Sequence, residues 1–345
     1  MIKIEGSYLE GGGQIVRTAV ALSSIMSKSI EIINIRKGRT KPGLKNQHIH
    51  AIKALQKLCG AKVEGLVLGG EHLIFQPKKL KSKTLNIDIK TAGSITLLLQ
   101  SLLIPCLFLD KKITLRIKGG TCTNWSMPVE FLENVLLQYF EPYCDKLKLK
   151  QEKRGYYPKG GGKIEIKLKP KFNEHPIEKI NQGKLVLIKG ISHASKSLEN
   201  AKVAERQAKK AKELLKKYEV PIKITVEYSD TLSIGSGITL WAIFENEQGD
   251  KEVILGSDSL GARGKKSEIV GKEAAEKLIN EIDNCACVDV HSADNLIPLM
   301  AFLPGSKIKV GEISKHTLTN IYTVEKFFGK IFEVKNNIIT RSQQV

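Results

Sequence analysis

The chain has 345 residues, of which 41% are hydrophobic, and its 55 Lys and Arg outnumber its 36 Asp and Glu to give a net charge of +19. This length accommodates two domains, or one large domain with an insertion. The surplus of positive charge favours a polyanionic partner, with nucleic acid as the first candidate. A lysine-rich surface that serves only solubility or thermal stability is the plain alternative.

Three observations indicate a cytoplasmic protein with no membrane partner. The longest apolar run, 95–109, is interrupted by polar residues and by Pro105, and it is too short to cross a bilayer. No secretory signal precedes the first expected strand, 2–5. The six cysteines form no CxxC pair, which argues against a structural zinc site and predicts reduced thiols.

Taken in chain order, the predicted elements form strand-then-helix units that occur three times, each a βαβα unit with polar turns before its helices. The first unit has strands and helices at 2–5, 14–26, 29–35 and 46–58. The second has them at 85–90, 95–107, 112–118 and 129–139. The third has them at 286–290, 295–303, 307–311 and 317–328. Such repeats place their helix N-termini along one edge, so distant residues meet in one cleft.

Between the second and third units the pattern changes. Residues 184–282 predict a short strand, a helix at about 200–218, further strands and a second helix at about 268–282. We therefore expect an α+β fold in which residues 1–183 and 283–345 form a large repeat domain. A small α+β domain, 184–282, is inserted between repeats two and three.

The first candidate site is the glycine turn at the N-terminus. Glu10 precedes three glycines, and Arg17 follows one to two turns into the expected helix. Glycine turns before helices let backbone N–H groups approach phosphate oxygens. A carboxylate there suits a divalent metal ion; a turn in which the glycines only serve conformation is the alternative.

Three further motifs are weaker indications of a phosphate or nucleic-acid site. A basic and polar stretch includes Arg36, Arg39, Gln47 and His48; arginine forks suit phosphate, but a basic surface loop is equally consistent. Trp125 stands in a polar loop, where it could stack on a base or pack half-buried. The segment 154–163 mixes aromatic, basic and glycine residues and is either a nucleic-acid contact or a hairpin entry.

His316 is the sharpest single candidate. It stands at the start of the last expected helix, at the same place in its unit as the turns at Arg39 and Gly120. An imidazole is mostly neutral near pH 7 and can act as a base or a nucleophile. Together with the glycine turn, this indicates phosphoryl or nucleotidyl chemistry.

In combination these motifs resemble the RNA 3′-terminal phosphate cyclases over nearly the whole chain. The matching segments are 10–17, 36–44 with Gln47 and His48, 92–100, 156–162, 292–295, and 316 with 318–320. The resemblance implies a core of three repeated units, each with two helices and four strands, and a small inserted α+β domain. It also implies ATP, Mg²⁺ or Mn²⁺, and an RNA with a 3′-terminal phosphate as partners.

The resemblance also implies residue roles. His316 matches the histidine that becomes adenylylated. The ATP site matches Gln100, Pro128, His291, Ser292, Ala293, Asp294 and Asn295. The phosphate end matches Arg17, Arg36, Arg39, Gln47 and His48, with Glu10 as the metal ligand. His291 departs from the aromatic residue that is frequent there, and Asn295 from a glutamine; both bear on nucleotide preference.

The implied activity is ATP-dependent conversion of an RNA 3′-phosphate into a 2′,3′-cyclic phosphate through a covalent histidine–AMP. Two other classes stay open. A non-catalytic relative that acts as a binding protein in ribosome assembly is expected to lack the nucleophile, so His316 argues against it. An enolpyruvyl-type transferase built on similar repeats handles small acids and does not need a charge of +19. The sequence leaves the oligomeric state open.

Overall fold

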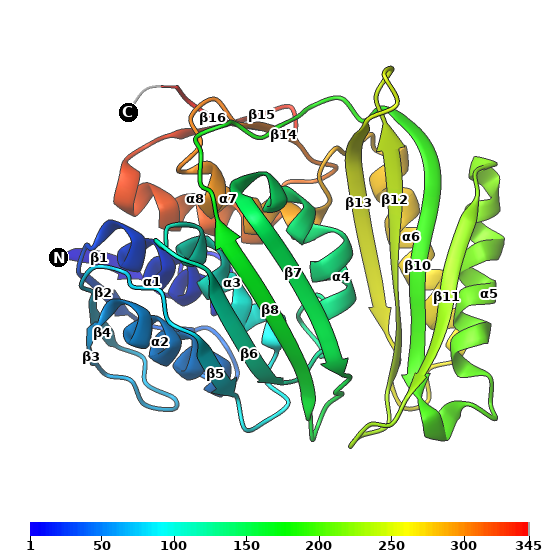
Figure 1. Ribbon diagram of the computed structural model, residues 1–345, viewed down its shortest axis with the longest axis horizontal. Coiled ribbons are helices and arrows are strands. Elements are labelled where there is room, and N and C mark those ends of the chain that lie inside the picture. Colours follow the sequence, from blue (N-terminus) through cyan, green and yellow to red (C-terminus); the bar gives the residue numbers. More distant parts are fainter. Residues whose placement is uncertain (344–345) are drawn as a thin grey trace.

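The computed structural model describes residues 1–343, and its strands and helices repeat one topology three times. In each repeat a four-stranded sheet has two parallel strands followed in space by two antiparallel ones, in the orders β1-β2-β4-β3, β5-β6-β8-β7 and β9-β14-β16-β15. Two helices accompany each sheet (Figure 1). The predicted α+β class and the three units of two helices and four strands are therefore confirmed.

The elements of the three repeats follow one another except for one break. The first repeat comprises β1 (Ile2–Glu5), α1 (Gln14–Met26), β2 (Ile30–Ile33), α2 (Asn46–Cys59), β3 (Lys62–Glu64) and β4 (Leu73–Gln76). The second comprises β5 (Leu85–Asp88), α3 (Ile95–Leu107), β6 (Ile113–Gly119), α4 (Val129–Asn134), β7 (Cys144–Lys153) and β8 (Gly162–Pro170). The third comprises β9 (Glu178–Lys179), α7 (Val290–Met300), β14 (Lys307–Lys309), α8 (Lys315–Phe328), β15 (Phe332–Lys335) and β16 (Ile338–Arg341).

The break in the third repeat holds a fourth sheet with a different order, β11-β10-β12-β13. Its elements are β10 (Lys184–Ser195), α5 (Val203–Leu215), β11 (Ile222–Ser229), β12 (Ser236–Glu245), β13 (Lys251–Leu260) and α6 (Ser267–Asp283). Strand β9 pairs with β14 in the third sheet, but β10 of the fourth sheet follows β9 in the chain. The fourth sheet and its helices therefore interrupt the third repeat between β9 and α7. The limits of an inserted domain at 184 and 282 stay a prediction.

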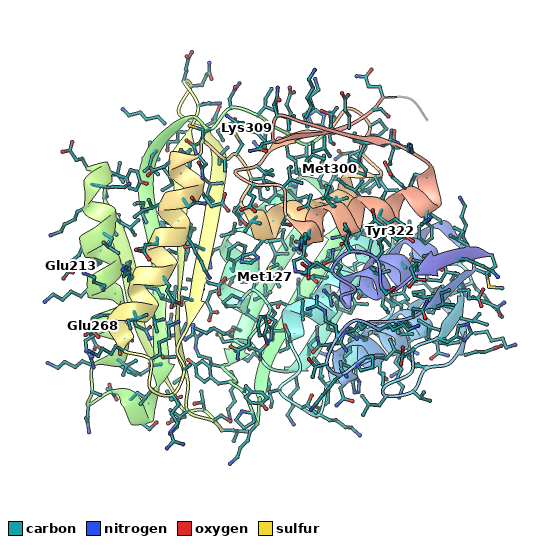
Figure 2. All side chains as sticks on the ribbon, turned by 180° about the vertical axis from the view of Figure 1, so that it is seen from behind. Met127, Glu213, Glu268, Met300, Lys309 and Tyr322 are labelled. Carbon is teal, nitrogen blue, oxygen red and sulfur yellow. The ribbon has the colours of Figure 1, made fainter. Side chains whose placement is uncertain are left out.

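Two hydrophobic cores correspond to this arrangement. Helices of all three repeats contribute to one core, in which α1 packs against α3 and α8 and α7 packs against α8. The second core lies between the fourth sheet and helices α5 and α6. These two helices lie side by side in Figure 2, where Arg206 of α5 donates hydrogen bonds of 2.7 and 2.9 Å to Glu268 of α6.

One predicted strand is wrong. Residues 286–290 were expected to form the first strand of repeat three, but only Val288 forms a bridge, with Val310. The side chain of Asp289 then accepts from the backbone N–H groups of His291 and Ser292, which caps α7 at Val290. The segment 291–295 therefore lies on the first turns of a helix instead of in a turn before one.

The buried carboxyl group of Glu281 joins α6 to this helix. Its Oε1 accepts a hydrogen bond of 2.9 Å from the backbone N–H of Val290. Burial, together with the nearby charge of Asp289, raises the pKa of Glu281 to about 7. Between about pH 4.5 and 7 the folded state thus holds more protons than the unfolded chain at this group, so its contribution to stability falls as the pH rises.

We expect Glu281→Gln to lessen the loss of stability that accompanies rising pH, because the amide keeps the acceptor oxygen and carries no charge. Between pH 5 and pH 8.5 the wild-type free energy of unfolding should fall by on the order of 2 kcal/mol more than that of the variant. Urea denaturation at both pH values measures this difference. Glu276→Gln, at an exposed position of the same helix, should follow the wild type; equal slopes in all three proteins would contradict the assignment.

Candidate functional site

The glycine turn before α1 brings two basic side chains together. A β-carbon on Gly13 would lie 2.1 Å from Nε2 of His48 and 3.1 Å from Nη1 of Arg17. The first contact is too short for a β-carbon and the second is tight, so the position of His48 requires glycine at position 13. The turn therefore serves close packing of α2 against the start of α1.

Hydrogen bonding determines which nitrogen of His48 carries the proton. The backbone N–H of Lys45 donates to Nδ1 over 3.1 Å, so the proton of the neutral ring is on Nε2. Burial, followed by the charge of Arg17, lowers the pKa of His48 well below its usual value, which keeps the ring neutral. Nε2 lies 3.5 Å from Nη1 of Arg17. Two donors thus face the same place, an arrangement that suits an anion.

His316 is held at both its side chain and its main chain by Gln14, the first residue of α1. Nε2 of Gln14 donates to the backbone carbonyl of His316 over 2.6 Å, which fixes the amide orientation and directs Oε1 to Nδ1 of the imidazole. Because Oε1 only accepts, Nδ1 carries the proton and Nε2 is the unprotonated nitrogen. Ser314 caps α8 by accepting from the N–H of Thr317, and this places His316 in the first turn.

The charges around His316 come from the first repeat. Burial is the main cause that lowers the pKa of His316 below its usual value. The charge of Glu10 opposes this effect, and the charges of Arg17 and Arg39 add to it. Glu10 and Arg39 form an ion pair of 2.8 Å. The imidazole is therefore neutral near pH 7 and close to groups that suit phosphate.

Helix α7 adds a buried acid to this site. Burial raises the pKa of Asp294 to about 6, although the charges of His291 and Arg17 act to lower it. The Asp294 carboxylate accepts from Asn295 over 2.6 Å, and its backbone carbonyl accepts from Asn320 of α8 over 2.5 Å. The start of α7 is thus tied to α8 only four residues after His316.

A small pocket lies where the helices of the three repeats converge. Its polar lining comes from Gln14, Arg17, Gln100, Asp294, Asn295 and Asn320. Gln100 of α3 is thereby brought beside the Arg17 and Asp294 side chains. One pocket thus joins predicted residues that are as far apart in the chain as Arg17 and Asn295.

Other predicted residues lie further from His316 or point elsewhere. Ser292 and Ala293 are fully buried, and the Ser292 hydroxyl donates to the capping Asp289 over 3.0 Å. His291 lies 3.8 Å from Asp258 and packs edge-on against the Phe131 ring.

In the loops, Arg36 donates to the carbonyls of Lys41 and Gly43 over 2.7 and 2.9 Å, so it braces the loop that carries Arg39. Pro128 is buried at the start of α4. The oxygen of the Gln47 side chain lies against Gly93.

Sequence reasoning did not assign roles to Gln14, Asp289 or Asn320. Gln14 stands inside the glycine motif, and Asp289 directly before a helix is a recognisable N-cap signal. The contact between Gln14 and His316 spans 302 positions and has no local signal.

Comparison with known proteins assigns this architecture to a class. A sequence model described as RNA 3′-terminal phosphate cyclase matches residues 8–334. The chain belongs to the RNA 3′-terminal phosphate cyclase family. Among the residues that the structure describes, no helix has the length and apolar character needed to cross a membrane.

Curated relatives that carry the same name match almost the full chain. The protein of Pyrococcus furiosus is 46% identical over 338 residues, which cover 98% of this chain and 96% of the relative. That of Pyrococcus abyssi is 45% identical with the same coverage. That of Archaeoglobus fulgidus is 39% identical over 341 residues, which cover 98% of this chain and 99% of the relative.

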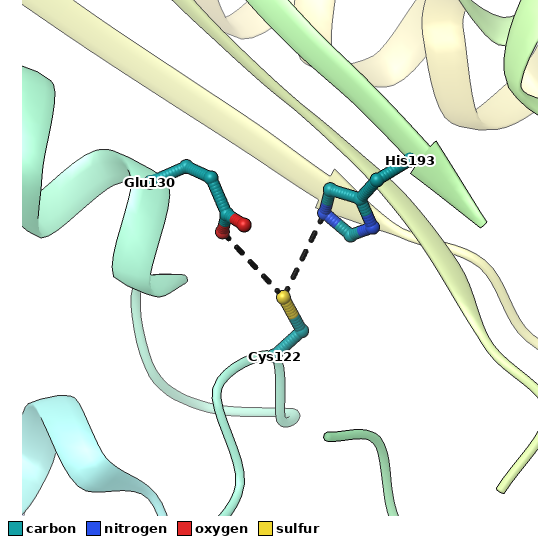
Figure 3. A group of neighbouring side chains, drawn as sticks. All are labelled: Cys122, Glu130 and His193. Atoms are coloured by element: carbon teal, nitrogen blue, oxygen red, sulfur yellow. Dashed lines mark hydrogen bonds between the residues drawn. The ribbon is translucent and has the colours of Figure 1, made fainter. Parts of the chain in front are cut away.

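A second buried cluster lies between α4 and the fourth sheet (Figure 3). Cys122, Glu130 and His193 each place one potential ligand atom within 4.8 Å of the others. The same space also holds a guanidinium group: Nη1 of Arg154 donates to Glu130 and lies 3.8 Å from the Cys122 sulfur. Both ring nitrogens of His193 have a partner: the Tyr156 hydroxyl lies 2.7 Å from Nδ1, and the Cys122 sulfur lies 3.6 Å from Nε2.

This cluster does not suit a metal ion. Burial raises the pKa of the Cys122 thiol, and a ligand sulfur must be a thiolate. Burial and then the charge of Arg154 lower the pKa of His193 to about 3, so the ring is neutral but its acceptor nitrogen already has a partner. Arg154 also donates to Glu227 of β11 over 2.8 Å. The cluster is an ionic link between the second repeat and the fourth sheet.

We expect Arg154→Met to destabilise the protein by about 3–5 kcal/mol, because it leaves the Glu130 carboxylate buried without its counter-charge. Urea denaturation measures the effect, and adding Glu130→Gln to the variant should recover part of the loss. The matched control is Arg206→Met, which removes an exposed pair and should change stability little. An Arg154→Met protein as stable as the wild type, or stoichiometric zinc in the purified wild type, would show that the cluster is not this link.

Proposed function

We propose that this protein uses ATP to convert an RNA 3′-terminal phosphate into a 2′,3′-cyclic phosphate, and that His316 carries AMP during the reaction. The main observation behind the proposal is that the Gln14 amide contacts two groups of His316, the ring Nδ1 and the backbone carbonyl. It leaves Nε2 unprotonated beside the basic residues of the first repeat. The names of the curated relatives support the RNA 3′-phosphate as substrate.

In the first step Nε2 of His316 attacks the α-phosphorus of ATP. The new bond is N–P, the bond from that phosphorus to the pyrophosphate oxygen breaks, and pyrophosphate leaves with the electron pair. The imidazole becomes positively charged, and its Nδ1–H keeps the proton and donates it to the Gln14 oxygen in a charge-assisted hydrogen bond. Gln14 is thus a positioning residue for the nucleophile.

The phosphate groups would be held by the donors that converge on Gly13. Nη1 of Arg17 and Nε2–H of His48 face each other over 3.5 Å, and a phosphate oxygen accepts from both. Arg39 and Gln47 extend this set, and Arg36 supports it by bracing the Arg39 loop. The buried Nε of Arg17 has no hydrogen-bond partner among the described residues, which fits a site built for a further acceptor.

Glu10 would supply the oxygen ligand for Mg²⁺ or Mn²⁺. A single carboxylate fits Mg²⁺, which binds through one or two carboxylates together with phosphate oxygens and water. The ion would supply positive charge at the pyrophosphate that leaves. Glu10 is paired with Arg39 over 2.8 Å, so an ion held by Glu10 and the Arg39 guanidinium would lie side by side and both would balance phosphate charge.

The nucleotide would lie across the second and third repeats. Gln100 and Asn295 line the pocket next to Arg17, and Asp294 is buried at its edge. His291 would offer a flat surface for adenine, and Pro128, buried at the start of α4, would support the adenine site from below. Ser292 and Ala293 would act from within the helix, the first through the Asp289 cap and the second through packing.

The later steps use the RNA end. An oxygen of the RNA 3′-phosphate attacks the phosphorus held on His316, the N–P bond breaks, and AMP becomes joined to the RNA through a diphosphate. The neighbouring 2′-OH then attacks the terminal RNA phosphorus, loses its proton, and expels AMP. One difficult displacement is thereby divided into easier ones.

His316→Ala should abolish covalent labelling by ATP that is radioactive at its α-phosphate, by roughly a thousandfold or more, because the nucleophile is gone. The wild-type label should be labile in acid and stable in alkali, as a phosphorus–nitrogen bond is. The His316 side chain is partly buried but lies outside both hydrophobic cores, so the variant should stay close to the wild-type melting temperature.

His50→Ala is the matched control for this experiment. His50 lies on α2, two residues after His48, and its variant should label like the wild type. Wild-type labelling of His316→Ala would reject His316 as the nucleophile. A wild type that takes no label while it binds RNA would favour a non-catalytic binding protein instead.

A further inference from the structure

Trp125 is the most exposed large hydrophobic residue described in the structure. Its exposure is 97%, and Tyr157, Leu232 and Ile234 are also more than half exposed. We call these four residues the aromatic platform. Soluble proteins expose single apolar residues routinely, but a cluster that includes Trp and Tyr marks an interaction site.

The backbone conformation of Trp125 also indicates an interaction site. Its φ is +66°, a conformation that favours glycine. The turn is fixed on either side by Thr123 and Ser126, whose hydroxyls lie 2.9 Å apart, and Ser126 also donates to the Thr123 carbonyl over 3.0 Å. Neither backbone preference nor burial accounts for a tryptophan here, which points to a role in contacting another molecule.

Three loops meet to form the platform. Cys122 forms a bridge with Tyr156, which places the Trp125 loop beside Tyr157. The backbone N–H of Lys159 donates to the Ser233 hydroxyl over 3.0 Å. A β-carbon on Gly161 would lie 2.5 Å from the Leu232 side chain, so the 230–235 loop packs directly on the 155–162 loop. The buried Arg154, which forms the ionic link, directly precedes the 155–162 loop in the chain.

The platform is continuous with the phosphate end of the site. Gln47 lies against Gly93, and the neighbouring Ala92 packs against both Gly120 and Gly160. The Thr96 hydroxyl donates to the carbonyl of Met127 over 2.8 Å, next to Pro128. A chain of packing contacts therefore links Gln47, through the turn at 92–93, to the loops that carry Trp125 and Tyr157.

We propose that the platform binds the nucleotides that precede the RNA 3′ end, with bases stacked on Trp125 and Tyr157 and a phosphate near Lys159. The inference deepens the proposed function and rests on it. Stacking on aromatic rings tolerates every base, and the positive charge of the chain favours the backbone. Lys159 is exposed and forms no ion pair within 4 Å among residues 1–343, so it is available to a phosphate.

The two tryptophans of the chain allow a direct test. Trp241 is only 7% exposed, so a neutral quencher such as acrylamide reports mainly on Trp125. The full chain is titrated without ATP with a single-stranded RNA of about ten nucleotides that ends in a 3′-phosphate. RNA should shield Trp125 from acrylamide, and Trp125→Ala should lower RNA affinity about tenfold. Trp125→Phe should keep most of the affinity, and Val334→Ala, an exposed apolar residue on β15, should keep all of it.

Acrylamide shielding and RNA affinity test the platform, whereas labelling by ATP tests the covalent mechanism at His316. Unchanged RNA affinity in Trp125→Ala, with no shielding in the wild type, would overturn the platform even if ATP still labels His316. Shielding that depends on protein concentration instead of RNA would assign the surface to a second copy of this chain and also overturn the proposal. Shielding by RNA in a protein that ATP does not label would leave the platform and reject the covalent mechanism.

Discussion

The amide of Gln14 contacts both the ring and the backbone carbonyl of His316, and the candidate site depends on this contact. The backbone carbonyl can only accept, so it fixes the amide, and the amide in turn fixes the proton on Nδ1. Two residues separated by 302 positions are thus joined, and with them the first and third repeats. Because α1 packs against α8, the contact is supported by the core of the repeat domain.

The surroundings of His316 follow from the same packing. Gly13 permits His48 and Arg17 to approach each other, and the burial that results keeps the His48 ring neutral and lowers the pKa of Arg17 to about 10. Two donors that face one place without an acceptor between them are costly in an apolar interior unless an anion binds there. The site thus combines an unprotonated nitrogen with donors arranged for phosphate.

Local signals in the sequence predicted much of this structure. The helix 14–26 and the start of the helix at 46 agree with the structure because glycine turns and apolar spacing determine them. The strand 286–290 is wrong because Asp289 caps a helix after a single bridge. Arg17 and His316 were identifiable from motifs, whereas Gln14 and the Arg154 cluster depend on contacts between distant segments, which no local pattern encodes.

The tautomer of His316 in the free protein shows directly whether Gln14 holds the ring proton on Nδ1. Long-range ¹H–¹⁵N correlation spectra of ¹⁵N-labelled protein near pH 7.5 distinguish the two ring nitrogens, and His316→Ala identifies the signals. The lowered pKa of His316 keeps the ring neutral at this pH. We expect the proton on Nδ1 in the wild type, and we expect Gln14→Ala to shift the ring toward a mixture of tautomers. A wild-type ring with its proton on Nε2 would contradict this expectation, because that nitrogen could not attack ATP.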